Sequence, residues 1–126
     1  MVQPVKIINE LKGKELCIHN LLDKKGSSFV QDLMAKFKGT SEFDIKIVSK
    51  EKVFSPRLNA FVNGLTNPIK AGKIEIFIST TNADKNSALE VAHTLVHEYI
   101  HADMLRKLNT IAPSILDLNF RQTYEA

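Results

Sequence analysis

The chain has 126 residues and a formal net charge of +3, from 17 lysines and arginines against 14 aspartates and glutamates. This length suits one domain, residues 1-126, and a hydrophobic fraction of 44% is ordinary for globular proteins, which excludes disordered and collagen-like chains. Polar residues interrupt every apolar stretch and Cys17 is the only cysteine, so we expect no signal peptide, membrane span or internal disulfide, and we predict a cytoplasmic location.

The N-terminal third of the chain predicts helices. Residues 5-11 are ambiguous between a strand and a helix, and residues 15-22 predict a short helix that ends in a polar turn. A second helix follows, capped by Ser27 or Ser28 and stopped by Gly39. Apolar residues at steps of one, three and four predict that this helix packs one face into the core. The members of this face are Phe29, Val30, Leu33, Met34 and Phe37.

The middle of the chain predicts strands. Residues 43-47 alternate apolar and polar side chains, which indicates a half-buried strand. Prolines and glycines divide the region 53-73, so we expect only a weak strand around residues 58-62 between loops. Residues 74-80 form the clearest strand pattern, with isoleucines at alternate positions, and residues 81-86 predict a polar loop.

A long helix should follow, because Ser87 and Glu90 have the spacing of a capping box. The helical period continues to about Leu108, and residues 115-124 predict the start of another helix. We expect the long helix to turn one apolar stripe, histidines included, towards the core. The stripe consists of Leu89, Ala92, His93, Val96, His97, Ile100, His101, Met104, Leu105 and Leu108.

The same helix contains the pattern HExxH, formed by His97, Glu98 and His101. Histidines four residues apart lie about 40° apart around a helix and about one turn apart along it, so both imidazoles can reach one tetrahedral ion. Glu98 lies about 60° from His101, an offset that keeps it from being a third ligand but leaves it within reach of a water on that ion. We therefore predict a Zn²⁺ site with ligands His97 and His101 and with Glu98 as the general base of a hydrolysis.

Other readings of these residues stay open. The two histidines can instead be hydrogen-bonded core residues, although burying neighbouring imidazoles without a shared partner is costly. His93 extends the series, but it lies about 11 Å along the axis from His101, so we expect it to support a ligand or to pack in the core. Asp103 points to a different face and should support the site indirectly or be exposed.

The segment 91-104 resembles the active-site helix of the zincin-fold metallopeptidases. It is most similar to the SprT-like group and its bacterial relatives, in which an apolar and a small residue flank the motif, as Val96 and Ala102 do here. The predicted order of elements is similar too: N-terminal helices, a small mixed sheet, and a strand that leads to the motif helix. The resemblance implies an α+β, zincin-like fold with a long active-site helix.

The resemblance also implies an activity. It implies a zinc-dependent peptidase in which His97 and His101 hold Zn²⁺, Glu98 is the general base, and a peptide or protein is the substrate. The strand 74-80 would be an edge strand along which an extended peptide pairs, since an edge offers unpaired N–H and C=O groups. On this view Ile76, Phe77 and Ile78 are substrate-binding residues.

The two histidines leave one zinc ligand unidentified, because catalytic zinc normally has three protein ligands. The family takes the third from a residue downstream of the motif, where this chain has no further histidine or cysteine. Glu125 has the best spacing, but it is the penultimate residue, where backbones often fray. We otherwise expect the natural chain to continue beyond Ala126 and to supply the ligand there, or the site to be degenerate.

Two alternatives to a free peptidase concern partners. A zincin-like regulatory or interaction module would hold zinc without turnover, but such regulators carry a helix-turn-helix, for which we find no candidate. A DNA-associated protease would need a nucleic-acid surface. The chain has three arginines, no tryptophan, and lysines interleaved with acids, so we expect a solvated lysine surface rather than a phosphate-binding patch.

Overall fold

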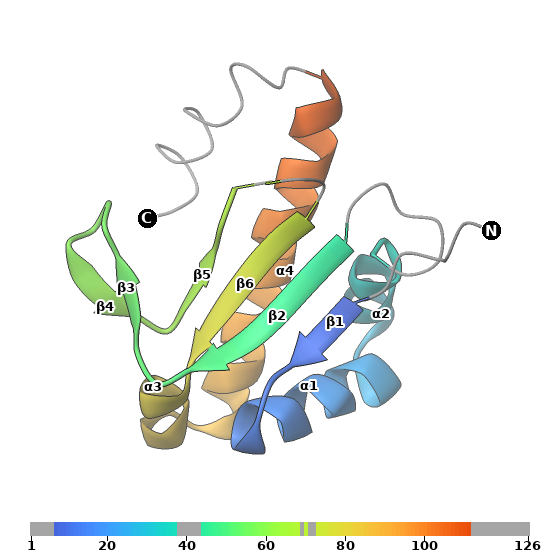
Figure 1. Cartoon of the computed structure of the whole chain (residues 1–126). Coiled ribbons are helices and arrows are strands. Elements are labelled where there is room, and N and C mark those ends of the chain that lie inside the picture. Colours follow the sequence, from blue (N-terminus) through green and yellow to red (C-terminus); the bar gives the residue numbers. More distant parts are fainter. Residues whose placement is uncertain (1–6, 38–43, 69, 71–72, 112–126) are drawn as a thin grey trace.

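A computed structural model describes residues 7-37, 44-68, 70 and 73-111, with side chains described up to residue 107 (Figure 1). These residues form a mixed α+β architecture with four helices. In chain order the elements are β1 (Ile7–Glu10), α1 (Gly13–Lys25), α2 (Ser28–Ala35), β2 (Asp44–Lys50), β3 (Val53–Ser55), β4 (Ala60–Val62), β5 (Gly64–Thr66), β6 (Lys73–Ser79), α3 (Thr80–Lys85) and α4 (Ala88–Ile111).

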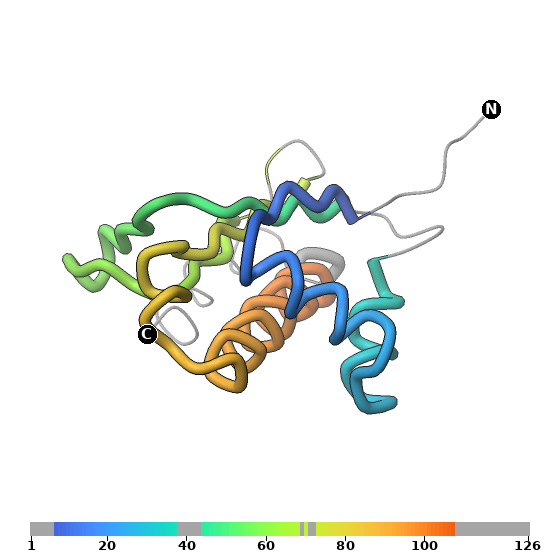
Figure 2. The backbone as a smooth tube through the Cα atoms, turned by 90° about the horizontal axis from the view of Figure 1, so that it is seen from below, coloured from blue at the N-terminus to red at the C-terminus, as the bar shows by residue number. Residues whose placement is uncertain are grey.

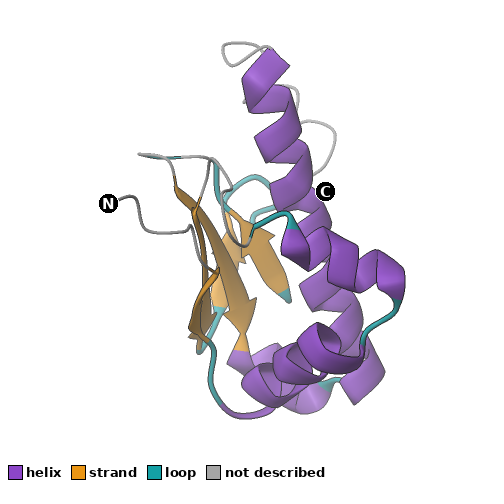
Figure 3. Ribbon diagram, turned by 90° about the vertical axis from the view of Figure 1, so that its right-hand side faces the viewer, coloured by secondary structure: helices purple, strands orange, loops and turns teal. Residues whose placement is uncertain are grey.

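The strands build a small mixed sheet in the order β1-β2-β6-β5. β1, β2 and β6 are parallel, whereas β5 runs antiparallel to β6, and β3 pairs with β4 in a separate hairpin. The helices α1, α2 and α4 lie on one side of the sheet (Figures 2 and 3). None of the helices among the described residues combines the length and apolar character that crossing a lipid bilayer requires.

The core lies between this sheet and α4. Because side chains alternate across a strand, β2 and β6 each turn every second residue towards the helices. The buried members on β2 and β6 are Ile45, Ile47, Ile74, Ile76 and Ile78. From α2 and the turn after it, Leu33, Met34 and Phe37 join this core, as predicted, whereas the side chain of Phe29 is 61% exposed.

The buried stripe of α4 agrees with the predicted one only in part. Six predicted members are buried or packed against the core, and the side chain of Leu108 lies outside the described residues; the six are Ala92, Val96, Ile100, His101, Met104 and Leu105. Leu89 is 80% exposed, and His93 and His97 are exposed as well. The helix has apolar residues over a wide arc, so its sequence alone does not fix which part of that arc meets the sheet. The side chains that do are Val91, Leu95, Tyr99, Ala102 and Leu105. His93 and His97 therefore lie outside the buried face, whereas His101 is buried.

Buried polar contacts fix α4 in this orientation. The Tyr99 hydroxyl shares a 2.7 Å hydrogen bond with Nε2 of His19, a buried residue of α1 to which the sequence assigned no role. Burial, together with the charge of Asp23, raises the pKa of Tyr99, so its hydroxyl stays neutral. This bond joins two helices across the core and sets the rotation of α4, on which the motif depends.

A second polar anchor holds the far end of α4. Asp103 is buried and receives Arg106 at 2.9 Å, Lys107 at 3.0 Å and Lys36 of the α2 terminus at 3.3 Å. Burial by itself raises the pKa of Asp103, but the hydrogen bonds from Lys107, Arg106 and Lys36 outweigh it, and the pKa lies below its usual value. Asp103 therefore ties α4 to Lys36 at the end of α2.

Several predicted boundaries are confirmed and others are wrong. Ser27 caps α2 and Ser87 caps α4, as expected from their spacing. Residues 81-86 are not a loop, because α3 occupies Thr80–Lys85. The weak strand expected around residues 58-62 is β4, and β3 and β5 were not predicted. Gly39 and the helix predicted at residues 115-124 lie outside the described residues.

Candidate metal centre

The middle of α4 brings three potential ligands together. His97, Glu98 and His101 each offer one donor atom, and these atoms lie within 4.8 Å of one another. The imidazole centroids of His97 and His101 are 4.2 Å apart, and Nδ1 of His101 is 3.7 Å from Oε1 of Glu98. No other such group of histidine, cysteine and acidic side chains occurs among the described residues.

Both histidines are held in the form that binds metals. Burial, with the neighbouring charge of His97, lowers the pKa of His101 to about 4. The His97 side chain is exposed overall, but its ring is partly enclosed by the cleft; this partial desolvation, with the charge of His93, also lowers the pKa of His97. At neutral pH both rings are therefore uncharged, and each keeps a nitrogen lone pair for an ion.

The lowered pKa of His101 predicts a pH dependence for the metal-free protein. The ordinary pKa is 6.5 and the folded value is about 4, so between these values the unfolded chain binds more protons than the folded one. The free energy of unfolding should therefore fall by about 1 to 2 kcal/mol from pH 7 to pH 5. Urea titrations of the parent and of His101→Gln measure this, and an equally steep loss in the variant would contradict it.

Glu98, the remaining residue of the motif, is held in place by a hydrogen bond from a residue of the sheet. Oγ1 of Thr66 donates to Oε1 of Glu98 at 2.8 Å and lies 3.1 Å from the Glu98 carbonyl oxygen. Thr66 is 1% exposed and Glu98 is 4% exposed, so this is a buried hydrogen bond to a carboxylate. It holds one oxygen of Glu98 in place, at the wall of the cleft described below.

The approach of β5 to α4 requires a glycine. A Cβ on Gly64 would lie 3.0 Å from Cγ of Glu98, 3.1 Å from Cγ2 of Thr94 and 3.2 Å from Oε2 of Glu98. Gly64 and Thr66 pair with Ile78 and Ile76 of β6, so all four lie on the face of the sheet that meets α4. A glycine inside a strand often marks such a close approach.

The Thr66 hydrogen bond gives a stability prediction. Thr66→Val keeps the shape of the side chain but leaves a buried carboxylate oxygen without its donor, so we expect the free energy of unfolding to fall by about 1 to 3 kcal/mol. Thr66→Ser should restore most of it. Thr94→Val is the matched control, because the Thr94 hydroxyl donates to the carbonyl of Glu90, one turn earlier on the same helix. Equal losses in Thr66→Val and Thr94→Val would contradict this role.

The motif lies in a cleft between α4 and the continuous segment of β4 and β5. The cleft has a volume of about 410 Å³. Its walls combine apolar side chains of the hairpin with the polar groups of α4. The lining includes Leu58, Phe61, Leu65, His97, Glu98 and His101.

The predicted substrate strand is in the wrong place. β6 is not an edge strand, because β2 pairs with one side of it and β5 with the other. Ile76 and Ile78 are buried in the core, and the backbone around Phe77 pairs with Leu65 and Val48. The edge beside the motif is β5, which is three residues long and too short for a strand pattern to identify.

The other residues that the sequence singled out, His93 and Glu125, have different outcomes. His93 is exposed in the cleft, with its ring centroid 6.4 Å from that of His97, so it is not a core histidine. Glu125 lies outside the described residues. Neither Gly64 nor Thr66 was predicted as a site residue. The one signal for them in the sequence was a glycine followed two residues later by a residue with a hydroxyl group, in a region that was predicted to be mostly loops.

Comparisons with known proteins identify no relative. No model of a protein family matches the chain. No curated protein and no solved structure matches it either. The fold and the candidate site therefore rest on this chain's own residues.

Proposed function

We propose that this protein is a zinc-dependent peptidase with a zincin-like fold, as the resemblance of its motif helix to the SprT-like group implies. The observation that carries the proposal is the convergence of His97, Glu98 and His101, with donor atoms within 4.8 Å of one another, in a cleft beside an edge strand.

The donor set suits zinc. Zinc prefers imidazole nitrogen and carboxylate oxygen in a compact tetrahedral shell, and the two imidazoles are uncharged at neutral pH. His97 and His101 would hold the ion. Catalytic zinc normally has a third protein ligand, for which Glu125 is the candidate that the sequence offers. When bound, zinc supplies a Lewis acid for the attack of water on a peptide carbonyl.

The protein's own backbone and side chains would bind the peptide and transfer the protons. A peptide extended along the free edge of β5 can pair with its backbone, which presents the scissile bond to the motif. Glu98 then takes a proton from the attacking water and returns it to the leaving amine. Thr66 occupies one carboxylate oxygen with a hydrogen bond of 2.8 Å, so the carboxylate is oriented before the substrate arrives.

Metal-dependent cleavage tests the proposal. The full chain, loaded with zinc, is incubated with a mixture of unstructured peptides, and new termini are counted by mass spectrometry. We expect cleavage with zinc and none after a chelator removes it. Zinc binding without any cleavage would favour the regulatory module instead, and cleavage that persists in the chelator would contradict a zinc mechanism.

A further inference from the structure

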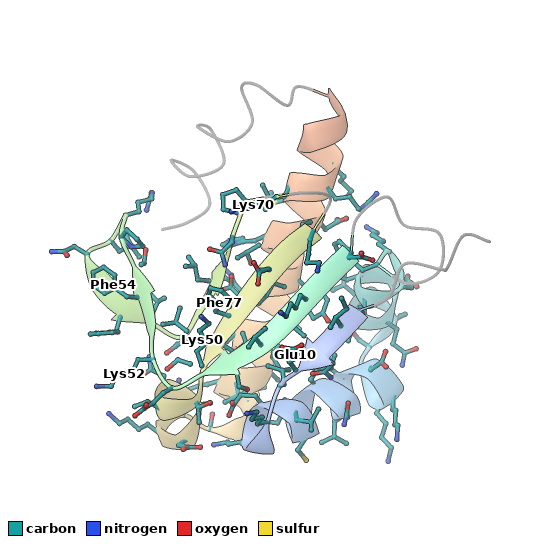
Figure 4. All side chains as sticks on the ribbon, in the orientation of Figure 1. Glu10, Lys50, Lys52, Phe54, Lys70 and Phe77 are labelled. Carbon is teal, nitrogen blue, oxygen red and sulfur yellow. The ribbon has the colours of Figure 1, made fainter. Side chains whose placement is uncertain are left out.

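The hairpin of β3 and β4, on which Figure 4 labels Phe54, exposes large apolar side chains. Phe54 is 44%, Leu58 42% and Phe61 62% exposed. The rings of Phe54 and Phe61 contact each other edge to face, with centroids 5.4 Å apart. A hairpin of three-residue strands gains little stability by leaving such side chains in water, so their grouping here points to a ligand.

Phe61 lies between two hollows of different chemistry. On one side it lines the cleft that contains the motif, together with Leu58. On the other side it lines a hollow of about 240 Å³ that includes Lys52 and Lys85. Nζ of Lys52 lies 5.7 Å from the centroid of the Phe61 ring. Among the described residues, no acidic side chain lines this second hollow.

The strand beside the motif, β5, is joined directly to the segment that contains Phe61. The edge of β5 continues backwards through Asn63 into β4, which ends at Val62 next to Phe61. Asn63 is fixed at the bend: its carbonyl accepts the Ser79 N–H at 2.9 Å, and its side-chain oxygen accepts the Asn82 amide at 2.9 Å. A peptide that extends along β5 away from the motif would therefore contact Phe61 first, and Lys52 and Lys85 after it.

We propose that the substrate carries a large apolar side chain, seated on Phe61 and Leu58 next to the scissile bond, and an acidic side chain beyond it at Lys52 and Lys85. This inference rests on the proposed function and adds a substrate class to it. The apolar contact supplies most of the affinity, since burying a leucine-sized side chain favours binding about tenfold or more. The exposed lysines add selectivity of about two- to fivefold.

The test measures binding, so it does not depend on turnover. Labelled peptides carry leucine or alanine at one position and glutamate, glutamine or lysine at successive positions on either side. Their affinity for the zinc-loaded Glu98→Gln variant is measured by fluorescence anisotropy. We expect the leucine peptide with a glutamate at one particular spacing to bind at least about tenfold more tightly than its alanine counterpart.

Variants locate the subsite. Phe61→Ala, made in the Glu98→Gln background, should remove the preference for leucine, and Lys52→Glu with Lys85→Glu should reverse the order of the glutamate and lysine peptides. Phe29→Ala is the matched control, because Phe29 is 61% exposed on α2 and lines none of the cavities used here. Leu58→Ala gives a second, independent variant of the subsite, and thermal melting confirms that each variant folds.

The outcomes separate the subsite from the catalytic proposal. Equal binding of leucine and alanine peptides, or a leucine preference that survives Phe61→Ala, would overturn the subsite. A leucine and glutamate preference that disappears in Phe61→Ala supports it. If that preference stands while the zinc-loaded parent leaves every peptide intact, the subsite is kept and the peptidase activity is contradicted.

Discussion

Replacing Glu98 by glutamine should lower the rate of peptide hydrolysis by about a hundredfold to ten-thousandfold, while zinc stays bound. The reason is that an amide cannot take the proton from the attacking water, and a positioned general base contributes about that factor. Glutamine can still accept the Thr66 hydrogen bond through its carbonyl oxygen, so the fold around the site should be unchanged. Initial rates and zinc content of parent and variant, measured side by side, check both parts.

The matched control is Glu75→Gln, on the inner strand β6 and outside the cleft lining. It makes the same chemical change and should leave the rate within about twofold, since surface substitutions away from a site have small effects. If Glu98→Gln hydrolyses peptide as fast as the parent does, Glu98 is not the general base.

Replacing His97 by alanine should remove both zinc and hydrolysis. We expect zinc affinity to fall by more than about a hundredfold, because even groups that only orient a ligand contribute ten- to a hundredfold. Stability without metal should hardly change, since the His97 side chain is exposed. Zinc titration with a competing chelator measures the affinity, and thermal melting of the metal-free proteins measures the fold.

His93→Ala is the control for that variant. His93 is also exposed, lies one turn from His97 on the same helix, and is not a member of the three-residue group. It should therefore keep zinc at the parent's affinity. A loss of zinc in His93→Ala as large as in His97→Ala would mean that the ligand pair is wrongly assigned.

The parts of the fold that follow from short-range pattern could be predicted. Alternation identified β2 and β6, because a strand buried on one face repeats every two residues. The Ser87 and Glu90 spacing identified the start of α4, because a cap satisfies backbone groups locally. The motif is of the same kind: His97 and His101 meet because both lie on one helix, whatever surrounds it.

The parts that depend on tertiary pairing could not be predicted. β5 has only three residues, and its place at the edge is set by pairing with β6, so the sequence pointed to the wrong strand. The rotation of α4 is set by His19 and by the sheet, so the predicted buried stripe was displaced. Thr66 forms a hydrogen bond with Glu98, which lies 32 residues later in the chain. At that separation the spacing of two residues does not predict whether they are in contact.

The zinc content of the purified chain is the measurement that bears most directly on the proposed metal centre. The protein is prepared without added zinc and analysed for metals by elemental analysis, with the His97→Ala variant treated identically. We predict about one zinc per chain in the parent and almost none in the variant. Well under one zinc per chain in the parent, or equal zinc in the two proteins, would contradict a zinc site on His97 and His101.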